Sequence, residues 1–272
     1  MIVDGKAIAA DILARTKARA GKLASAPRVI ALVANETPAT ASYLKIKSRF
    51  ASEAGCQFEI QKFPEDVTAA ALRTAAATTN AAALIIQLPL PSHIDPRDVC
   101  DAIPGSKDAD VLSGAARELF ATGALATLLP PVVAAIQEIL VREGVVVQEK
   151  NAVVIGEGWL VGKPAAAWLM QQGAQVTVVT EASENFAAAL RAADLIISGA
   201  GAPALIKPDM IKEGVVIIDA GTSESDGALM GDADPACAEK CALFTPVPGG
   251  VGPIAVACLF QNAVTLAERV AL

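Results

Sequence analysis

Histidine is nearly absent from this chain of 272 residues, and its cysteines are few and scattered. A Ser-His-Asp or Cys-His catalytic site would have to use the single histidine, His93. No nucleophile elbow accompanies it, so we expect His93 to lie in a loop. The five cysteines are odd in number and do not indicate a disulfide framework. Cys237 and Cys241 are four residues apart, but a zinc site needs about four ligands, so we expect no bound metal.

The chain also lacks a block of basic residues. Its 22 lysines and arginines stand against 29 acidic residues, giving a net charge of -7. Nucleic acid and anionic membrane surfaces are therefore poor candidates as partners. The N-terminus leads directly into a polar, helix-patterned segment from Lys6 to Leu23, and no later run resembles a membrane span, so we expect a cytoplasmic protein. With 53% hydrophobic and 19% charged residues, the composition is that of a soluble globular protein.

Apolar runs of strand length alternate with alanine-rich helical patterns, which predicts βα units and a largely parallel sheet. The runs are mostly continuous, which indicates strands buried on both faces. They cover Val29–Ala34, Cys56–Gln61, Leu84–Gln87, Ala152–Ile155, Gln175–Val179, Leu195–Ser198 and Val215–Asp219. The helical patterns cover Tyr43–Glu53, Thr68–Thr78, Val132–Val141, Pro164–Gln171 and Glu184–Ala192.

A break near residue 125 divides these elements into two groups. There Gly123-Ala124-Leu125 leads through Pro130-Pro131 into a new helix and a new glycine-rich βα unit. We therefore predict an α/β fold of two domains. An N-terminal α/β domain would comprise residues 1–122 and a C-terminal helix over 253–272, and a second, Rossmann-like domain would comprise residues 123–252. The cleft expected between them would be the favoured ligand site.

The segment from Val153 to Pro164 is typical of a buried strand, a glycine turn and a helix start. Gly156, Gly158 and Gly162 follow the spacing Gly-x-Gly-x-x-x-Gly, which departs by one residue from the commonest dinucleotide fingerprint. Glycines let the backbone approach a pyrophosphate, whose charge then meets the positive end of the helix. With the flanking strand and helix, the pattern favours a dinucleotide site over a purely structural turn.

Charged residues near this turn bear on the choice of nucleotide. Glu181 ends the next predicted strand, where a carboxylate can bind an adenosine ribose. Both Glu181 and Glu157 would repel a 2′-phosphate. Lys163 is the one cation nearby in the sequence, and a solvated surface lysine is an equal interpretation of it.

The run from Thr245 to Pro253 contains three prolines and three glycines in nine residues. Prolines fix φ and remove backbone donors, whereas glycines permit positive φ or close approach to the main chain. An apolar segment from Ile254 to Leu266 follows at once, so the loop would enter a helix with its free amides pointing outward. A stiff connector is the plainer interpretation, but this geometry suits a ligand.

Tyr43 and Lys47 are four residues apart in a predicted helix and therefore share a face. An aromatic ring beside an amine can stack on a planar ligand and transfer its protons, provided that burial or a neighbour lowers the amine pKa. Gln87, at a predicted strand end, and Asp110 are the candidate partners. Tyr-x-x-x-Lys also occurs in short-chain dehydrogenases, but there the glycine turn precedes the pair, whereas here it follows by more than a hundred residues.

Taken together, these segments resemble the bifunctional methylenetetrahydrofolate dehydrogenase/cyclohydrolase family over essentially the whole chain. The matching segments are the Tyr-x-x-x-Lys helix at Tyr43 and Lys47, Gln-Leu-Pro-Leu-Pro at 87–91, Lys-Asp-x-Asp at 107–110, Val-Gly-Lys-Pro at 161–164 and the C-terminal signature at 245–253.

The resemblance implies a two-domain homodimer that oxidises 5,10-methylenetetrahydrofolate with NAD or NADP and then hydrates the methenyl product to 10-formyltetrahydrofolate, with no metal. Tetrahydrofolate derivatives would lie in the cleft. The implied catalytic residues are Lys47, Gln87 and Asp110, and the implied substrate-binding residues are Tyr43, Pro248, Gly249 and Gly250. The implied cofactor-binding residues are Gly156, Glu157, Gly158, Gly162, Lys163, Glu181 and Thr222.

The chain departs from the family pattern at several positions. Pro130-Pro131-Val132-Val133 replaces Pro-Cys-Thr-Pro, Val111 replaces a glycine and Ala255 replaces a threonine. The usual anchors for a 2′-phosphate are missing from the nucleotide turn and the following strand, which favours NAD on electrostatic grounds. Two alternatives stay open: an enzyme with cyclohydrolase activity alone, and a non-catalytic folate or nucleotide sensor.

Overall fold

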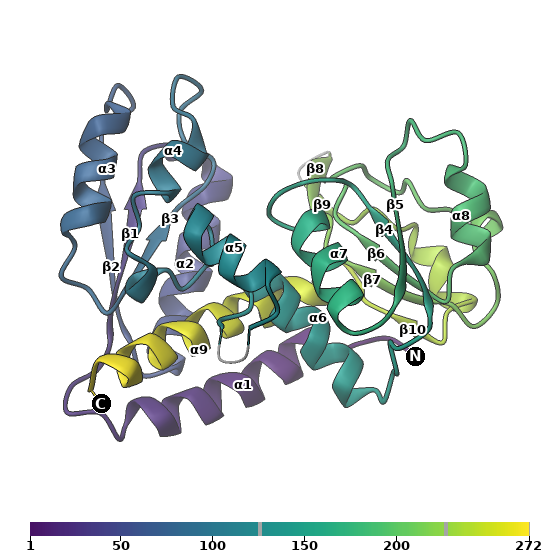
Figure 1. Ribbon diagram of the computed structural model, residues 1–272, viewed down its shortest axis with the longest axis horizontal. Helices are drawn as coiled ribbons and strands as arrows, with labels where there is room; N and C mark the ends of the chain where they lie inside the picture. The colour runs from purple at the N-terminus through teal and green to yellow at the C-terminus, as the bar shows by residue number, and fades with distance from the viewer. Residues whose placement is uncertain (125–126, 226–227, 272) are drawn as a thin grey trace. The chain divides into compact units, whose positions relative to one another are not determined.

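In a computed structural model, the described residues 1–124, 127–225 and 228–271 form two compact units (Figure 1). The three-stranded unit comprises Ala10–Pro131 and Val256–Leu272, and the five-stranded unit comprises Met1–Ala9 and Val132–Ala255. Residue 125, near which the sequence predicts the division, lies outside the described residues. The first residues belong to the five-stranded unit because the backbone of Val3 donates to Phe244 and that of Phe244 donates to Met1, both at 2.9 Å.

The three-stranded unit is built on a parallel sheet in the order β2-β1-β3, so that β1 lies between its two partners (Figure 1). Every strand is followed by a helix, as the alternating pattern predicts. The elements are α1 (Gly5–Ala20), β1 (Arg28–Val33), α2 (Pro38–Glu53), β2 (Gln57–Lys62), α3 (Ala69–Thr78), β3 (Ala83–Ile86), α4 (Pro96–Cys100), the 3-10 helix η1 (Gly105–Lys107) and α5 (Gly114–Ala121).

Helix α2 begins at Pro38, earlier than the sequence pattern predicts. The Thr37 side chain accepts a hydrogen bond from the Thr40 amide at 3.1 Å and caps the helix, while Pro38 occupies its first turn. Tyr43 and Lys47 therefore lie within a regular helix, one turn apart.

The five-stranded unit contains a parallel sheet in the order β10-β7-β6-β4-β5, which is Rossmann-like, and a small antiparallel pair. Helices α7 and α8 follow β4 and β5 (Figure 1). The elements are α6 (Pro131–Arg142), β4 (Asn151–Ile155), α7 (Gly162–Gln171), β5 (Gln175–Val179), α8 (Phe186–Ala192), β6 (Leu195–Ser198), η2 (Pro208–Met210), β7 (Val216–Asp219), β8 (Ser223–Ser225), β9 (Ala228–Met230), η3 (Pro235–Glu239) and β10 (Leu243–Phe244). The last helix, α9 (Val251–Ala271), begins in this unit and belongs to the three-stranded unit from Val256 onward.

Burial divides the strands into two groups. The residues of β3, β6 and β7 are all buried, and β1 and β4 are buried beyond their first residue. In contrast, β2 has no buried residue and β5 has only Val179. The prediction that every strand is buried on both faces was therefore wrong for β2 and β5, because each is an edge strand with polar residues on its exposed surface.

Helix α9 begins at Val251, so the last three residues of the Thr245–Pro253 run belong to its first turn rather than to a loop. Pro253 is compatible with that position because the first amides of a helix have no intrahelical partner. The C-terminal half of α9 lies beside α1 (Figure 1), where Arg19 donates to Glu268 at 2.6 Å and to Thr265 at 2.7 Å.

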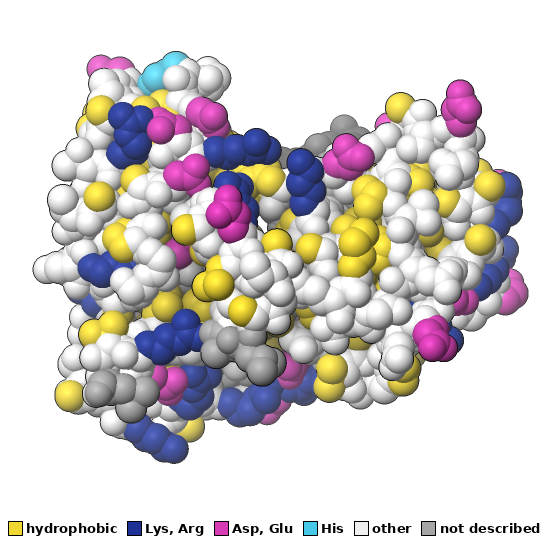
Figure 2. Space-filling model, viewed as in Figure 1, with side chains coloured by type: hydrophobic (Ala, Val, Ile, Leu, Met, Phe, Trp, Pro, Cys, Tyr) yellow, Lys and Arg dark blue, Asp and Glu magenta, His cyan; other side chains and the backbone are white. Residues whose placement is uncertain are grey.

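Among the described residues, α9 is the one helix long and apolar enough for a membrane span by length and composition. The sequence-based expectation that no run approaches this was therefore wrong. However, 61% of the relevant window is buried inside the protein, as in the core helix of a globular domain. On the face shown in Figure 2, acidic side chains are interspersed with basic ones.

Candidate active site

Lys47 is buried in the three-stranded unit, with only 6% of its surface exposed. Its Nζ donates a hydrogen bond to Oε1 of Gln87, which directly follows β3, at 3.0 Å. Nε2 of Gln87 in turn donates to the Leu88 carbonyl at 2.7 Å, so the amide presents its oxygen to the lysine. The carboxyl end of β3 and the middle of α2 therefore place an amine and its acceptor together.

Burial changes the proton affinity of Lys47 and of Asp110 in opposite directions. It lowers the pKa of Lys47, although the Asp110 carboxylate acts against this. Burial likewise raises the pKa of Asp110, with Asp108 adding to the rise and Lys47 opposing it. The site thus contains an amine that gives up its proton more readily than an exposed lysine, and a carboxyl group that keeps its proton more readily.

Tyr43 completes this cluster from the same helix. Nζ of Lys47 lies 5.1 Å from the centre of the Tyr43 ring, within the range of a cation–π contact. Desolvation and the nearby Asp110 raise the pKa of Tyr43 to about 12, so the phenol is neutral near pH 7. The residue as a whole is 40% exposed, which leaves a surface for a planar ligand to stack on.

The loop carrying Asp110 is held by the carboxylate of Asp108, which is 1% exposed. This carboxylate accepts hydrogen bonds from the Leu112 amide at 3.1 Å, the Ser113 amide at 2.8 Å and the Ser113 hydroxyl at 2.7 Å. Between these anchors Val111 adopts φ 58°, a conformation rare for a β-branched residue.

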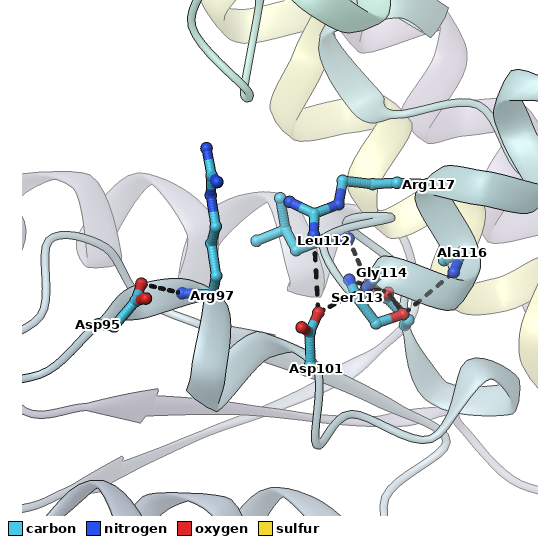
Figure 3. A network of polar contacts seen from close by, with 9 residues as sticks. Asp95, Arg97, Asp101, Leu112, Ser113, Gly114, Ala116 and Arg117 are labelled. Carbon is cyan, nitrogen blue, oxygen red and sulfur yellow. Dashed lines mark hydrogen bonds and ion pairs between the residues drawn. The ribbon is translucent and has the colours of Figure 1, made fainter.

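The loop ends where Ser113 caps α5 (Figure 3). Its hydroxyl accepts from the Ala116 amide at 3.3 Å. The carboxylate of Asp101 accepts from the Gly114 amide at 2.6 Å and pairs with Arg117 at 3.6 Å (Figure 3). The start of α5 is thereby tied to the end of α4, which fixes both ends of the segment that presents Asp110.

The five-stranded unit contains the predicted glycine turn between β4 and α7. Gly156 has φ 96°, and a Cβ on Gly162 would lie 2.0 Å from the Gly156 carbonyl oxygen, so both positions require glycine. Nothing lies within 4 Å of where a Gly158 Cβ would be, and this open side allows a ligand to approach the backbone. Such a strand–turn–helix cradle fits a dinucleotide pyrophosphate.

The charged residues predicted near the nucleotide lie around this turn. Glu157 and Lys163 line one hollow of about 380 Å³, together with Gly162, Ala166, Ala167, Met170 and Val178. Glu181 is exposed and lies two residues beyond the end of β5. Thr222 is also exposed and lies between β7 and β8.

Pro248, Gly249 and Gly250 form a turn in the five-stranded unit, whereas Lys47, Gln87, Asp110 and Tyr43 belong to the other unit. The peptide bond before Pro248 is cis, Gly249 has φ 109°, and the Gly250 amide donates to the Pro246 carbonyl at 2.8 Å. A Cβ on Gly5 would lie 1.9 Å from the Gly250 carbonyl oxygen, so the first residue of α1 packs tightly on this turn.

Comparison with known proteins accounts for both groups of residues. Residues 3–110 match the family described as "Tetrahydrofolate dehydrogenase/cyclohydrolase, catalytic domain", and residues 130–271 match its "NAD(P)-binding domain". The chain belongs to the tetrahydrofolate dehydrogenase/cyclohydrolase family. The predicted family and the predicted two-domain α/β fold are thereby confirmed.

Several members of the dehydrogenase/cyclohydrolase family resemble the chain over nearly its full length. The bifunctional protein FolD of Nitrosospira multiformis is 34% identical, covering 98% of this chain and 96% of its own. The crystal structure of the bifunctional FolD enzyme from Campylobacter jejuni has a TM-score of 0.95 at 30% identity, covering 99% of both chains. The Trypanosoma brucei enzyme, solved with NADP and an inhibitor, has a TM-score of 0.94 at 30% identity, covering 100% of this chain and 98% of its own.

Sequence reasoning missed three buried polar residues of this family member. Asn262 of α9 donates from Nδ2 to the carbonyls of Ala109 and Leu129, both at 2.9 Å, and so fixes the loop beside Asp110. Asp219 and Asp232 are 1% and 0% exposed in the five-stranded unit. Asp219 could have been found because an acid ends a buried strand at the edge where ligands of parallel sheets bind. Asn262 carries no comparable signal in an apolar helix.

Proposed function

We propose that this protein oxidises 5,10-methylenetetrahydrofolate to the methenyl form with NAD or NADP and hydrolyses the methenyl form to 10-formyltetrahydrofolate. The observation that carries the proposal is the buried Lys47 amine, hydrogen-bonded to Gln87 beside Asp110. Family membership supports the proposal, since the chain matches both the catalytic domain and the NAD(P)-binding domain of the family.

The hydrolytic step follows from the chemistry of Lys47. Water attacks the electrophilic methenyl carbon and must lose a proton as its oxygen forms the new bond. Burial lowers the pKa of Lys47, so more of its amine is neutral and able to accept this proton at Nζ. Gln87 holds Nζ through Oε1. As the bond between N5 and the former methenyl carbon breaks, N5 takes up one proton, and the hydroxyl of the hydrated intermediate loses the other to solvent to form the formyl carbonyl.

Folate binding would use the neighbouring groups. The exposed part of the Tyr43 ring offers a stacking surface, and Asp110 can form hydrogen bonds with the pterin. We assign Pro248, Gly249 and Gly250 to substrate binding on the strength of the family resemblance.

The glycine turn would hold the nucleotide through the amides and positive end of α7, with Gly156, Gly158 and Gly162 giving the pyrophosphate access to the backbone. Once bound, the nicotinamide supplies the hydride acceptor for the oxidation. The contribution of this chain is therefore to bind and orient the nucleotide. We place Lys163, Glu181 and Thr222 around it, as their positions near the turn and the strand ends suggest.

Of the two nucleotides, we propose NAD as the preferred one. Exposed carboxylates at Glu157 and Glu181 would repel a 2′-phosphate. Lys163 lines the same hollow as Glu157, so the negative charge of Glu157 offsets the positive charge of Lys163. One exposed charge pair at about 4 Å is worth about 1 kcal/mol in water, so we expect kcat/KM for NAD to exceed that for NADP by at least about fivefold.

A spectrophotometric assay tests the function and the preference together. Methylenetetrahydrofolate with NAD or NADP reports oxidation, and methenyltetrahydrofolate alone reports hydrolysis. Hydrolysis without oxidation would identify a cyclohydrolase alone, and neither reaction would identify a binding protein. Glu181→Gln should narrow the gap between nucleotides, and Glu184→Gln, three residues further along, is its exposed control. Higher kcat/KM with NADP in the unmodified protein would refute the preference.

We also propose that the protein is a homodimer acting in the cytoplasm. Within the described residues the outer edge of β5 pairs with no other strand, and Met170 of α7 and Val178 of β5 are 57% and 37% exposed. All five cysteines are buried thiols, as is usual in a reducing compartment. Sedimentation should give a dimer that Met170→Glu dissociates, and a monomeric unmodified protein would refute this. Cell fractionation tests the compartment.

A further inference from the structure

Two buried carboxylates lie at the carboxyl end of the five-stranded sheet. Asp219 ends β7, and Asp232 follows β9 after one residue. Each carboxylate lies against a glycine within two residues of the other acid: a Cβ on Gly221 would lie 2.1 Å from Asp232, and one on Gly231 would lie 2.3 Å from Asp219. Close packing of two acids in the interior requires hydrogen-bond donors for both.

The Asp232 carboxylate accepts hydrogen bonds from the loop after β6 and so holds that loop. Its Oδ2 accepts from the Ser198 hydroxyl at 2.6 Å and from the Ala200 amide at 2.8 Å, and its Oδ1 accepts from the Ala202 amide at 2.8 Å. One side chain thus fixes three donors within five consecutive residues.

The loop held by Asp232 packs directly against the glycine turn. A Cβ on Gly156 would lie 2.9 Å from the Gly199 carbonyl oxygen, and a Cβ on Gly199 would lie 2.4 Å from the Val161 side chain. A shift of this loop would therefore displace the first glycine of the turn or Val161, the residue before α7.

Asp219 holds the loop after β7 and the loop after β9 in the same way. It accepts from the Gly221 amide at 3.0 Å and the Ala233 amide at 2.8 Å. Its own amide donates to the hydroxyl of Thr245 at 2.6 Å, at the start of the run that continues to Gly250. The pair therefore connects the glycine turn, the loops after β6 and β7, and the beginning of the Pro/Gly run.

We propose that Asp219 and Asp232 are positioning residues that set these loops in the shape that binds the nicotinamide nucleotide. The inference rests on the proposed function, because it assumes that the nucleotide lies at this edge of the sheet. The carboxylates act through the backbone they hold. A pair that served stability alone would affect both activities in proportion to the folded fraction, whereas a positioning pair affects the nucleotide.

Asp232→Asn tests this with little change in shape. An amide cannot accept at both ends, so at least one bond to Ser198, Ala200 or Ala202 is lost. We expect the Kd for nucleotide, measured by calorimetry, to rise at least tenfold, while hydrolysis of methenyltetrahydrofolate stays within twofold. In the nucleotide-free protein, hydrogen exchange at residues 199–204 should accelerate. Asp209→Asn, an exposed acid of the same unit, is the matched control.

Ser198→Ala removes a single bond and should shift the nucleotide Kd and the exchange in the same direction by less, so a poorly folded Asp232→Asn does not end the test. Unchanged nucleotide affinity in both variants would overturn this inference but leave the proposed function standing. Losses of both activities in proportion to the folded fraction would overturn it too. If the unmodified protein binds no nucleotide, the proposed function and the inference fall together.

Discussion

Replacing Lys47 with methionine removes the amine while keeping much of the length of the side chain. In the unmodified protein, Nζ donates to Gln87 at 3.0 Å and lies 5.1 Å from the centre of the Tyr43 ring. Methionine fills most of that space but can neither donate to Gln87 nor accept a proton. The change therefore removes proton transfer from the site and leaves its walls largely in place.

The structure allows the size of the effect to be bounded. A positioned acid–base group contributes about 10²- to 10⁴-fold to a rate, so hydrolysis of methenyltetrahydrofolate should fall by at least about 100-fold. Leaving Oε1 of Gln87 without its donor costs about 1–3 kcal/mol. Relief of the desolvation of a buried ammonium offsets part of this cost. The free energy of unfolding should therefore change by less than about 2 kcal/mol, and folate binding should remain largely intact.

The assay follows the absorbance of methenyltetrahydrofolate across a range of pH, with urea denaturation as the check on folding. In the unmodified protein the rate should rise with pH as the amine loses its proton, and this dependence should disappear in Lys47→Met. Lys45→Met is the control, because Lys45 is exposed on the same helix two residues away. A folded Lys47→Met protein that hydrolyses the substrate at the unmodified rate would refute the assignment.

Two further predictions concern stability, both measured by urea denaturation. Asn262→Leu leaves the buried carbonyl of Ala109 and the partly buried carbonyl of Leu129 without their donor and should cost about 2–4 kcal/mol. Gln261→Leu on the same helix should cost much less, and equal losses would contradict this role. Burial raises the pKa of Asp219 from 3.8 to about 6. The folded protein therefore binds this proton more tightly than the unfolded chain does, which stabilises the fold at low pH. This stabilisation is lost as the pH rises from about 4 to about 6. Relative to Asp219→Asn, the unmodified protein should lose on the order of 2–3 kcal/mol over this window, and parallel pH curves would contradict the shift.

The βα alternation and the glycine turn could be predicted from the sequence because each depends on local pattern. Buried strands such as β3 and β6 are continuous apolar runs, and only glycine fits where Gly162 meets the Gly156 carbonyl. Likewise, Tyr43 and Lys47 share a helix face through spacing alone. These inferences needed no knowledge of long-range contacts.

Long-range contacts decided what the sequence could not. Strand β5 contains three valines, yet its place at the edge of the sheet leaves most of it exposed. Asn262 reaches Ala109 across 153 residues of sequence, and Asp232 reaches Ser198 across 34. Such partners are brought together only by the packing of separate elements, so local pattern gave no indication of them.

Val111 shows how such packing overrides local preference inside the site. A left-handed conformation costs a β-branched residue roughly 1–2 kcal/mol, and Val111 has φ 58°. The Asp108 carboxylate accepts three hydrogen bonds from Leu112 and Ser113. Hydrogen bonds to a charged group contribute about 1.5–3 kcal/mol each, which exceeds the cost at Val111. The buried carboxylate therefore imposes the turn on the loop that carries Asp110, although a valine occupies the left-handed position.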